Sequence, residues 1–131
     1  MPIELLWDNK DKTVIRQVFD GRWTWEEFYQ MNCNRIPEMM QSVDHTVHVF
    51  SDFSVARGVP IGGALTHARN VMRYYPENWG ILVIVGANTF VNLLVETFRH
   101  TFISTLGWKT FTAPTIEAAY KLTEEFAEKS L

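Results

Sequence analysis

The sequence predicts a single α/β domain whose sheet is mixed but mostly parallel. Strand-like and helix-like stretches alternate along most of the 131 residues, as in parallel strands joined by helices. Two strand-like runs at the start are separated by a short polar turn, which adds an antiparallel pair. The run from Trp79 to Val85 is almost wholly apolar, as expected of a central strand covered on both faces. We therefore expect one domain over residues 1–131, in the order β-β-α-β-α-β-α-β-α.

The composition disfavours several classes of protein. The chain is 47% hydrophobic and 14% aromatic, which is enough for a real core. Its formal net charge is -3 and no segment gathers Lys or Arg, so neither nucleic acid nor an anionic membrane surface is an expected partner. Cys33 is the only cysteine, so no internal disulfide can form. With no signal peptide and no membrane span in the sequence, we expect a cytoplasmic protein.

The opening is predicted to be a hairpin followed by a capped helix. Ile3–Trp7 and Thr13–Phe19 are rich in β-branched and aromatic residues. Thr24 and Glu27 have the spacing of a capping box, so the first helix begins here. Pro37 removes a backbone donor from this helix, and we expect a kink or break before it.

The centre of the chain is predicted to be a strand, a glycine-rich loop and a helix. Thr46–Phe50 has strand composition, and the polar residues that follow indicate that the chain leaves the core there. Four residues in the span 58–63 are glycine or proline. Apolar residues then recur at helical spacing and give the second helix one buried face. They are Ile61, Ala64, Leu65, Ala68, Met72 and Tyr75.

The remainder follows the same alternation. After the apolar strand Trp79–Val85, Asn88 is a suitable N-cap for a third helix that Gly107 would end. Trp108–Phe111 is a short last strand, and Thr115 can cap a fourth helix.

The predicted site lies beyond the carboxyl end of the third strand, where ligands of open α/β sheets usually bind. Gly62 and Gly63 leave the first amides of the second helix uncovered, so they could receive a carboxylate or phosphate with help from Arg57. The alternative is that these glycines only permit tight packing of the helix on the sheet. The candidate partner- or ligand-binding residues are Asp52, Ser54, Arg57, Gly58, Pro60, Ile61, Gly62 and Gly63.

The third helix carries more apolar residues than one core face needs. The surplus indicates either a homodimer interface or an unusually wide contact with the core. The residues of the possible interface are Val91, Val95, Phe98, Phe102 and Ile103.

The residue pattern gives no support for catalysis, a cofactor or a metal site. The four histidines lack the spacing of metal ligands, and Cys33 lies in a helix between two asparagines. Asp52 and Asp8 could act as acids or bases, but an aspartate at the end of a strand more often caps the following turn. We therefore predict a non-enzymatic protein without cofactor or metal.

The order of elements, together with three short segments, resembles the STAS domain and, more closely, the SpoIIAA-like group of bacterial proteins. The segments are Asp52–Ser54, the Gly-Arg-Trp-Thr-Trp-Glu-Glu of residues 21–27 and the Ala-Pro-Thr-Ile-Glu-Ala-Ala of residues 113–119. In the STAS antagonists of anti-sigma factors, a serine at the start of the second helix is phosphorylated. The matching Pro60, Ile61, Gly62 and Gly63 carry no hydroxyl, so that switch is not expected here.

Two functions follow as hypotheses. The resemblance implies a regulatory protein-interaction module, expected to be a homodimer, that docks a protein partner around residues 57–63 and the second helix. The alternative is a binder of a small apolar or acidic molecule, because SpoIIAA-like proteins resemble lipid-carrying domains of the CRAL-TRIO type. The many aromatic residues fit the second hypothesis if they enclose a void.

Overall fold

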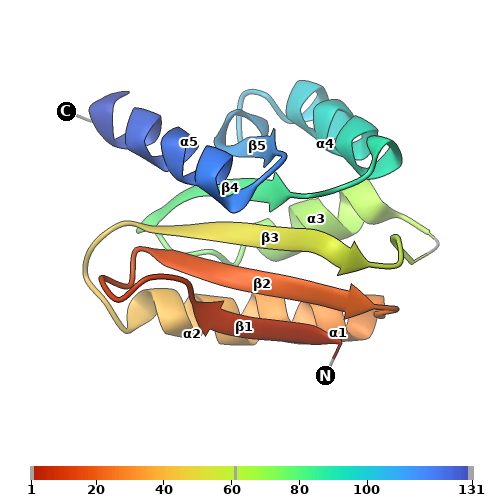
Figure 1. The fold of residues 1–131 in the computed structure, drawn as a ribbon, viewed down its shortest axis with the longest axis horizontal. Coiled ribbons are helices and arrows are strands. Elements are labelled where there is room, and N and C mark those ends of the chain that lie inside the picture. The colour runs from red at the N-terminus through yellow and green to blue at the C-terminus, as the bar shows by residue number, and fades with distance from the viewer. Residues whose placement is uncertain (1, 61, 130–131) are drawn as a thin grey trace.

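The computed structural model describes residues 2–60 and 62–129, and it confirms an α/β fold with a mixed, mostly parallel sheet (Figure 1). The strand order β1-β2-β3-β4-β5 follows the order along the chain. Strand β1 pairs with β2 antiparallel, and every later pair is parallel. The strands are β1 (Ile3–Trp7), β2 (Val14–Gly21), β3 (Val47–Ala56), β4 (Trp79–Val85) and β5 (Thr110–Ala113).

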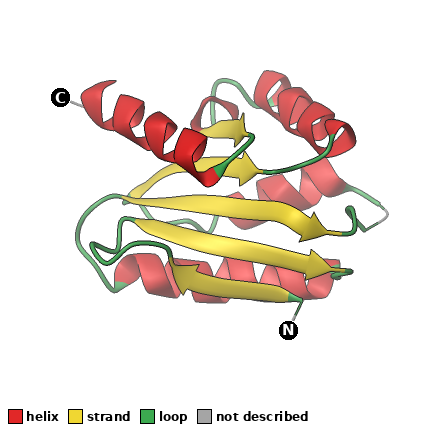
Figure 2. Ribbon diagram, in the orientation of Figure 1, coloured by secondary structure: helices red, strands yellow, loops and turns green. Residues whose placement is uncertain are grey.

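The helices cover the two faces of the sheet unequally (Figures 1 and 2). One cluster of buried residues joins the sheet to the first four helices, and a second joins the opposite face to the last helix. Because α5 covers only part of its face, β1 and β2 have no helix over them there. The helices are α1 (Trp25–Gln30), α2 (Ile36–Gln41), α3 (Ala64–Met72), α4 (Thr89–Thr101) and α5 (Ile116–Lys129).

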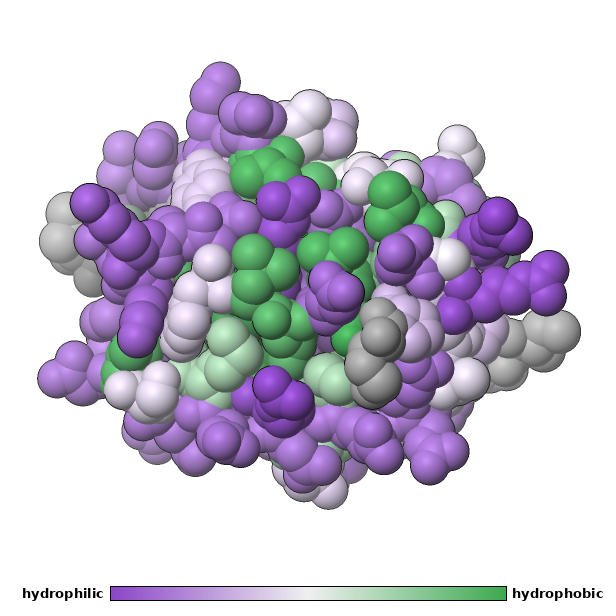
Figure 3. Space-filling model, turned by 60° about the horizontal axis from the view of Figure 1, so that its bottom comes forward, coloured by the Kyte–Doolittle hydropathy of each residue, from purple (hydrophilic) through white to green (hydrophobic). Residues whose placement is uncertain are grey.

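The edge of the sheet formed by β1 is partly apolar at the surface. Figure 3, in which the lower side of Figure 1 comes forward, shows hydrophobic residues gathered in the middle and hydrophilic residues around them. Leu6 of β1 is among the exposed large apolar residues, and it is paired in register with Arg16 of β2. At this edge, an exposed apolar side chain of β1 therefore lies beside a charged side chain of β2.

The start of the first helix and its break before Pro37 are as predicted. Thr24 and Glu27 form a complete capping box. A π-helix, Met31–Arg35, connects α1 to α2, and the Ile36 amide donates to the Met31 carbonyl. Because proline has no N–H to donate, the helix cannot keep its ordinary hydrogen bonding at this point, and the wider turn accommodates it.

The third strand is longer than predicted. It runs to Ala56 instead of ending at Phe50, and Ser51 and Asp52 are buried inside it. Polar side chains can occupy a buried strand when neighbours satisfy their hydrogen bonds. Gln17 of β2 donates to Ser51 at 3.1 Å, and Arg16 donates to Asp52 at 2.7 Å. The pairing with β2 therefore keeps the strand in the sheet.

The end of the third predicted helix also differs. Helix α4 starts after Asn88 as predicted, with the Val91 amide donating to its side chain, but it ends at Thr101. A turn and a short 3-10 helix, Gly107–Lys109, follow before β5. Gly107 is required at this point because a Cβ would lie 2.4 Å from the Arg99 carbonyl oxygen. The glycine permits the close approach of two chain segments instead of ending the helix.

His48 of β3 is expected to make stability depend on pH. Its side chain is 7% exposed, and its Nδ1 accepts from the Ile81 amide at 3.0 Å. Burial, and secondarily Lys109, lowers the pKa of His48 from 6.5 to about 4. The unfolded chain therefore takes up a proton first, and the stabilisation present above pH 6.5 is lost as the pH falls toward 4.

We expect the free energy of unfolding to fall by about 3 kcal/mol across this range, as measured by urea denaturation at each pH. In His48→Asn, the side-chain oxygen can still accept from the Ile81 amide but cannot be protonated. Most of this pH-dependent fall in the free energy of unfolding should therefore disappear. An equally steep pH dependence in this variant would show that another group is responsible.

Candidate functional site

An apolar cavity of about 110 Å³ lies between the sheet and helices α1, α3 and α4. It is partly open, and it is placed toward the carboxyl ends of β3 and β4, where Phe53 and Ile84 contribute to its wall. Val59, in the loop after β3, also lines it. This is the end of the sheet at which the sequence predicted a site, but the space lies beneath the helices.

The wall of the cavity is almost entirely apolar. Aromatic side chains from the first helix and the strands meet aliphatic side chains from α3 and α4. The apolar lining residues are Phe19, Trp23, Trp25, Phe28, Phe53, Val59, Ala64, Leu65, Ala68, Val71, Met72, Leu82, Ile84, Val91, Leu94, Val95 and Phe98. A space enclosed in this way favours an apolar occupant, since water would find few hydrogen-bond partners along the wall.

The polar residues of the lining come from β2, the π-helix, β3, the segment after α3 and β5. They are Gln17, Asn32, Ser51, Tyr75 and Thr110.

Four of these residues form one hydrogen-bonded network. Asn32 donates to Gln17 Oε1 at 2.8 Å, and Gln17 donates to Ser51 Oγ at 3.1 Å. Tyr75 donates its hydroxyl to Asn32 Oδ1 at 2.6 Å. Gln17, Asn32 and Ser51 are almost completely buried. The cavity therefore has a fixed polar region on an otherwise apolar wall.

This network is electrically neutral. Burial raises the pKa of the Tyr75 hydroxyl, so this group remains protonated and acts as a donor. Amide and hydroxyl groups in this arrangement can orient a ligand through hydrogen bonds, but they supply neither a base nor a nucleophile activated by one. The site can bind and orient a molecule.

The first helix and α3 are also joined beside the cavity. Trp25, which lines the cavity, packs against the ring of His67 with centroids 4.4 Å apart. The Tyr29 hydroxyl lies 2.6 Å from His67 Nδ1, and Asn70 donates to the same hydroxyl at 3.1 Å. These contacts connect the two helices that bound the space.

The predicted site residues of β3 lie on the opposite face of the sheet from the cavity. Side chains alternate along a strand, so Ser51 and Phe53 face the cavity while Asp52 faces the side of α5. Ser54 donates to Asp52 Oδ1 through both its amide, at 2.9 Å, and its hydroxyl, at 2.7 Å. Asp52 thus makes the turn-type contacts expected of an aspartate near a strand end.

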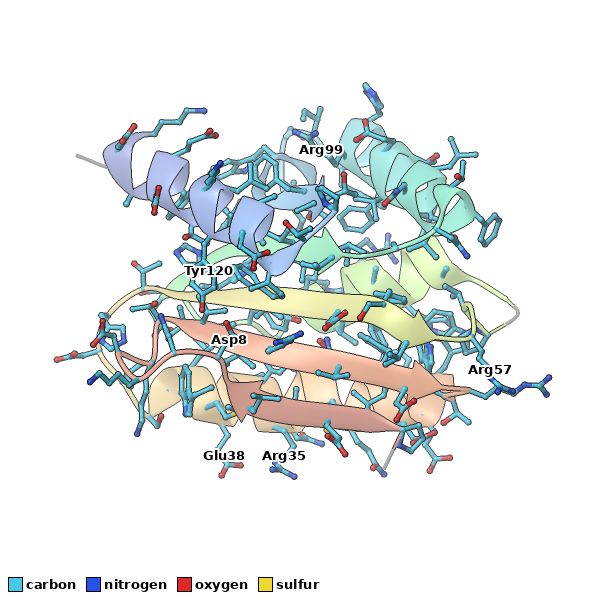
Figure 4. All side chains as sticks on the ribbon, viewed as in Figure 1. Asp8, Arg35, Glu38, Arg57, Arg99 and Tyr120 are labelled. Atoms are coloured by element: carbon cyan, nitrogen blue, oxygen red, sulfur yellow. The ribbon has the colours of Figure 1, made fainter. Side chains whose placement is uncertain are left out.

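Asp52 also belongs to a charged network on the face of the sheet that α5 partly covers. Arg16 donates to Asp52 at 2.7 Å and to Asp8 at 3.3 Å, and the Tyr120 hydroxyl donates to Asp8 at 2.5 Å. Figure 4 shows Asp8 and Tyr120 on the side of the sheet that faces the viewer. Burial raises the pKa of Asp52, but the bonds from Ser54 and Arg16 outweigh burial and hold it below its usual range.

The predicted loop residues surround one end of the fold without lining the cavity. Arg57 projects away from the molecule (Figure 4), and Pro60 is half-buried. Gly58 adopts φ +100°, and its carbonyl accepts from Trp23 at 3.0 Å. Gly62 and Gly63 are exposed at the start of α3 with positive φ, so both need a glycine. None of the described residues predicted to bind a partner or ligand lines the cavity. Ile61, which belongs to the same predicted set, lies outside the described residues.

The apolar residues of α4 separate into an inner and an outer set. Val91, Val95 and Phe98 are buried within the chain and line the cavity, so they are not available to a second copy. Phe102 is half-buried and Ile103 is exposed. The helix presents other large apolar side chains outward, namely Phe90 and Leu93.

The sequence interpretation missed the three buried polar residues of the cavity. Asn32 interrupts the apolar stripe of the first helix, and Gln17 stands inside a strand-like run. Each is a polar residue at a position where the pattern requires an apolar one. Such interruptions in two neighbouring elements are the signal that could have suggested a shared buried network.

Comparisons with known proteins leave the family open: no protein-family model matches the chain, and no curated protein matches it. Among the helices of residues 2–60 and 62–129, none is both long enough and apolar enough to cross a membrane. The same residues contain no group of three or more His, Cys, Asp or Glu placed to hold a metal ion.

Proposed function

We propose that this chain binds a small apolar molecule in the cavity, and that it is a binding protein rather than an enzyme. The observation that carries the proposal is the partly open apolar space of about 110 Å³ that the sheet, α1, α3 and α4 line. Apolar side chains that line an unfilled space lack dispersion contacts on that side. A ligand would restore those contacts.

The size of the space limits the ligand. An engineered apolar cavity of roughly 150 Å³ binds benzene, so a single ring or a short chain is the expected scale. A larger molecule would have to extend out of the cavity, which is partly open. The expected ligand is therefore a small apolar molecule.

Titration with benzene, followed by ¹H–¹⁵N NMR, tests the proposal. We expect saturable shift changes in the amides of α3 and α4 residues that line the cavity, with little change in α5. No saturable change, or changes scattered over the surface, would contradict binding in the cavity.

A second candidate is the regulatory interaction module of the STAS or SpoIIAA-like kind, acting as a homodimer. It is favoured by Phe90 and Leu93 of α4, which are 60% and 64% exposed and lie three residues apart on one helix face. Membership of that family remains a prediction from the order of elements. Light scattering tests the candidate: we expect a dimer that Leu93→Glu dissociates and that Ala127→Glu, at an exposed position of α5, does not. A wild-type chain that stays monomeric at high concentration would exclude it.

A further inference from the structure

The polar region of the cavity indicates what kind of apolar molecule fits it. Resting on the proposed function, we infer that the ligand is a neutral molecule with one hydrogen-bond-accepting oxygen, such as a carbonyl or ether, which accepts a hydrogen bond from the Ser51 hydroxyl. The ring or chain of the ligand would contact the aromatic and aliphatic wall.

The directions of the hydrogen bonds in the network follow from one fixed acceptor. The Phe28 carbonyl can only accept, and Asn32 Nδ2 donates to it at 2.9 Å. The same Nδ2 donates to Gln17 at 2.8 Å, so that atom of Gln17 must be the carbonyl oxygen. The amide of Gln17 therefore presents its NH₂ group to Ser51.

Ser51 is consequently the acceptor of the Gln17 bond, and its own hydrogen is directed elsewhere. Within residues 2–60 and 62–129, no acceptor is found for that hydrogen. Ser51 is 4% exposed and is one of the residues that line the cavity, so an acceptor seated against it in this space would use this donor. A buried donor without an acceptor is destabilising, and an accepting ligand removes that cost.

The charges around the cavity argue against an acid as ligand. The polar lining consists of neutral amide and hydroxyl groups. Arg16 is next to Gln17 in the chain, but it binds Asp52 and Asp8 on the other face of the sheet. A carboxylate near Ser51 would thus be buried without a counter-charge, which is strongly unfavourable. A pure hydrocarbon would leave the Ser51 donor unused.

Three probes with a six-membered ring distinguish these ligand classes: cyclohexanone and methylenecyclohexane, which match in shape, and the larger cyclohexanecarboxylate. Each is titrated into the full chain and followed by ¹H–¹⁵N NMR. We expect cyclohexanone to bind about tenfold more tightly than methylenecyclohexane, and the carboxylate to bind weakest. In Ser51→Ala, the affinity for cyclohexanone should fall below that for the hydrocarbon, because its carbonyl oxygen would be buried without a donor, while the affinity for the hydrocarbon changes little.

Ser54→Ala is the matched control, because it removes a hydroxyl from the same strand on the opposite face. It should leave the order of the three probes unchanged. Equal binding of cyclohexanone and methylenecyclohexane by the wild-type chain, or preference for the carboxylate, would overturn the inference while leaving the cavity a binding site. Failure of all three probes to bind there would overturn the proposed function as well.

Discussion

Substitution of Ala68 by Leu is expected to weaken benzene binding at least tenfold, as measured by the NMR titration. Ala68 lies on α3 and lines the cavity. The added carbons of Leu would occupy much of the 110 Å³ that the ligand needs. Because these atoms enter empty space, the free energy of unfolding should change by less than about 1 kcal/mol.

The matched control is Ala127→Leu, which makes the same change at an exposed position of α5. Both residues stand within helices, so the effect of the substitution on helix propensity is the same. The control should bind benzene like the wild type. Wild-type affinity in Ala68→Leu, with an intact fold, would place the ligand somewhere other than this cavity.

Substitution of Arg16 by Met is expected to lower the free energy of unfolding by about 3 kcal/mol at pH 7. The change leaves the Asp52 carboxylate, whose side chain is 4% exposed, without its cation. The two hydrogen bonds from Ser54 remain and still favour the charged carboxylate, but no arginine then balances its charge. Urea denaturation measures the loss, which should be smaller near pH 4, since a protonated Asp52 needs no counter-charge.

Two further variants separate the charge effect from the loss of the Arg16 side chain. Asp52→Asn in the Arg16→Met background should recover part of the stability, because an amide can still accept from Ser54 without carrying a charge. Arg22→Met, at an exposed arginine, should cost less than about 0.5 kcal/mol. If Arg16→Met were as mild as Arg22→Met, the ion pair would contribute little to stability.

Features set by neighbouring residues could be predicted from the sequence. The capping box of Thr24 and Glu27, the cap at Asn88 and the break before Pro37 each depend on the hydrogen-bonding chemistry of a few adjacent residues. The apolar run Trp79–Val85 likewise identified the strand β4, because its burial requires no knowledge of specific partners.

Features that depend on distant partners could not be predicted in this way. Ser51 and Asp52 indicated the end of a strand, yet Gln17 and Arg16 of the neighbouring strand hold them inside it. Asp52 and Ser54, two of the predicted site residues, lie on the face of β3 opposite the cavity, and the sequence does not show which face the helices cover.

The apolar surplus of α4 illustrates the same limit. Val91 and Val95 are spaced for a buried stripe, and so are Phe90 and Leu94. Only the packing against the sheet shows that Val91 and Val95 are buried while Phe90 is exposed. The surplus is explained in part by the cavity, to which α4 contributes a wall.

Pressurising a crystal of the protein with xenon shows whether the cavity accepts an apolar guest, because an empty apolar cavity takes up xenon. We expect a xenon site beneath α3 and α4, in contact with Ala68 and Val95, and no such site in Ala68→Leu. Ordered water molecules filling this space, or a collapsed interior without xenon, would contradict the claim that the cavity is built for an apolar ligand.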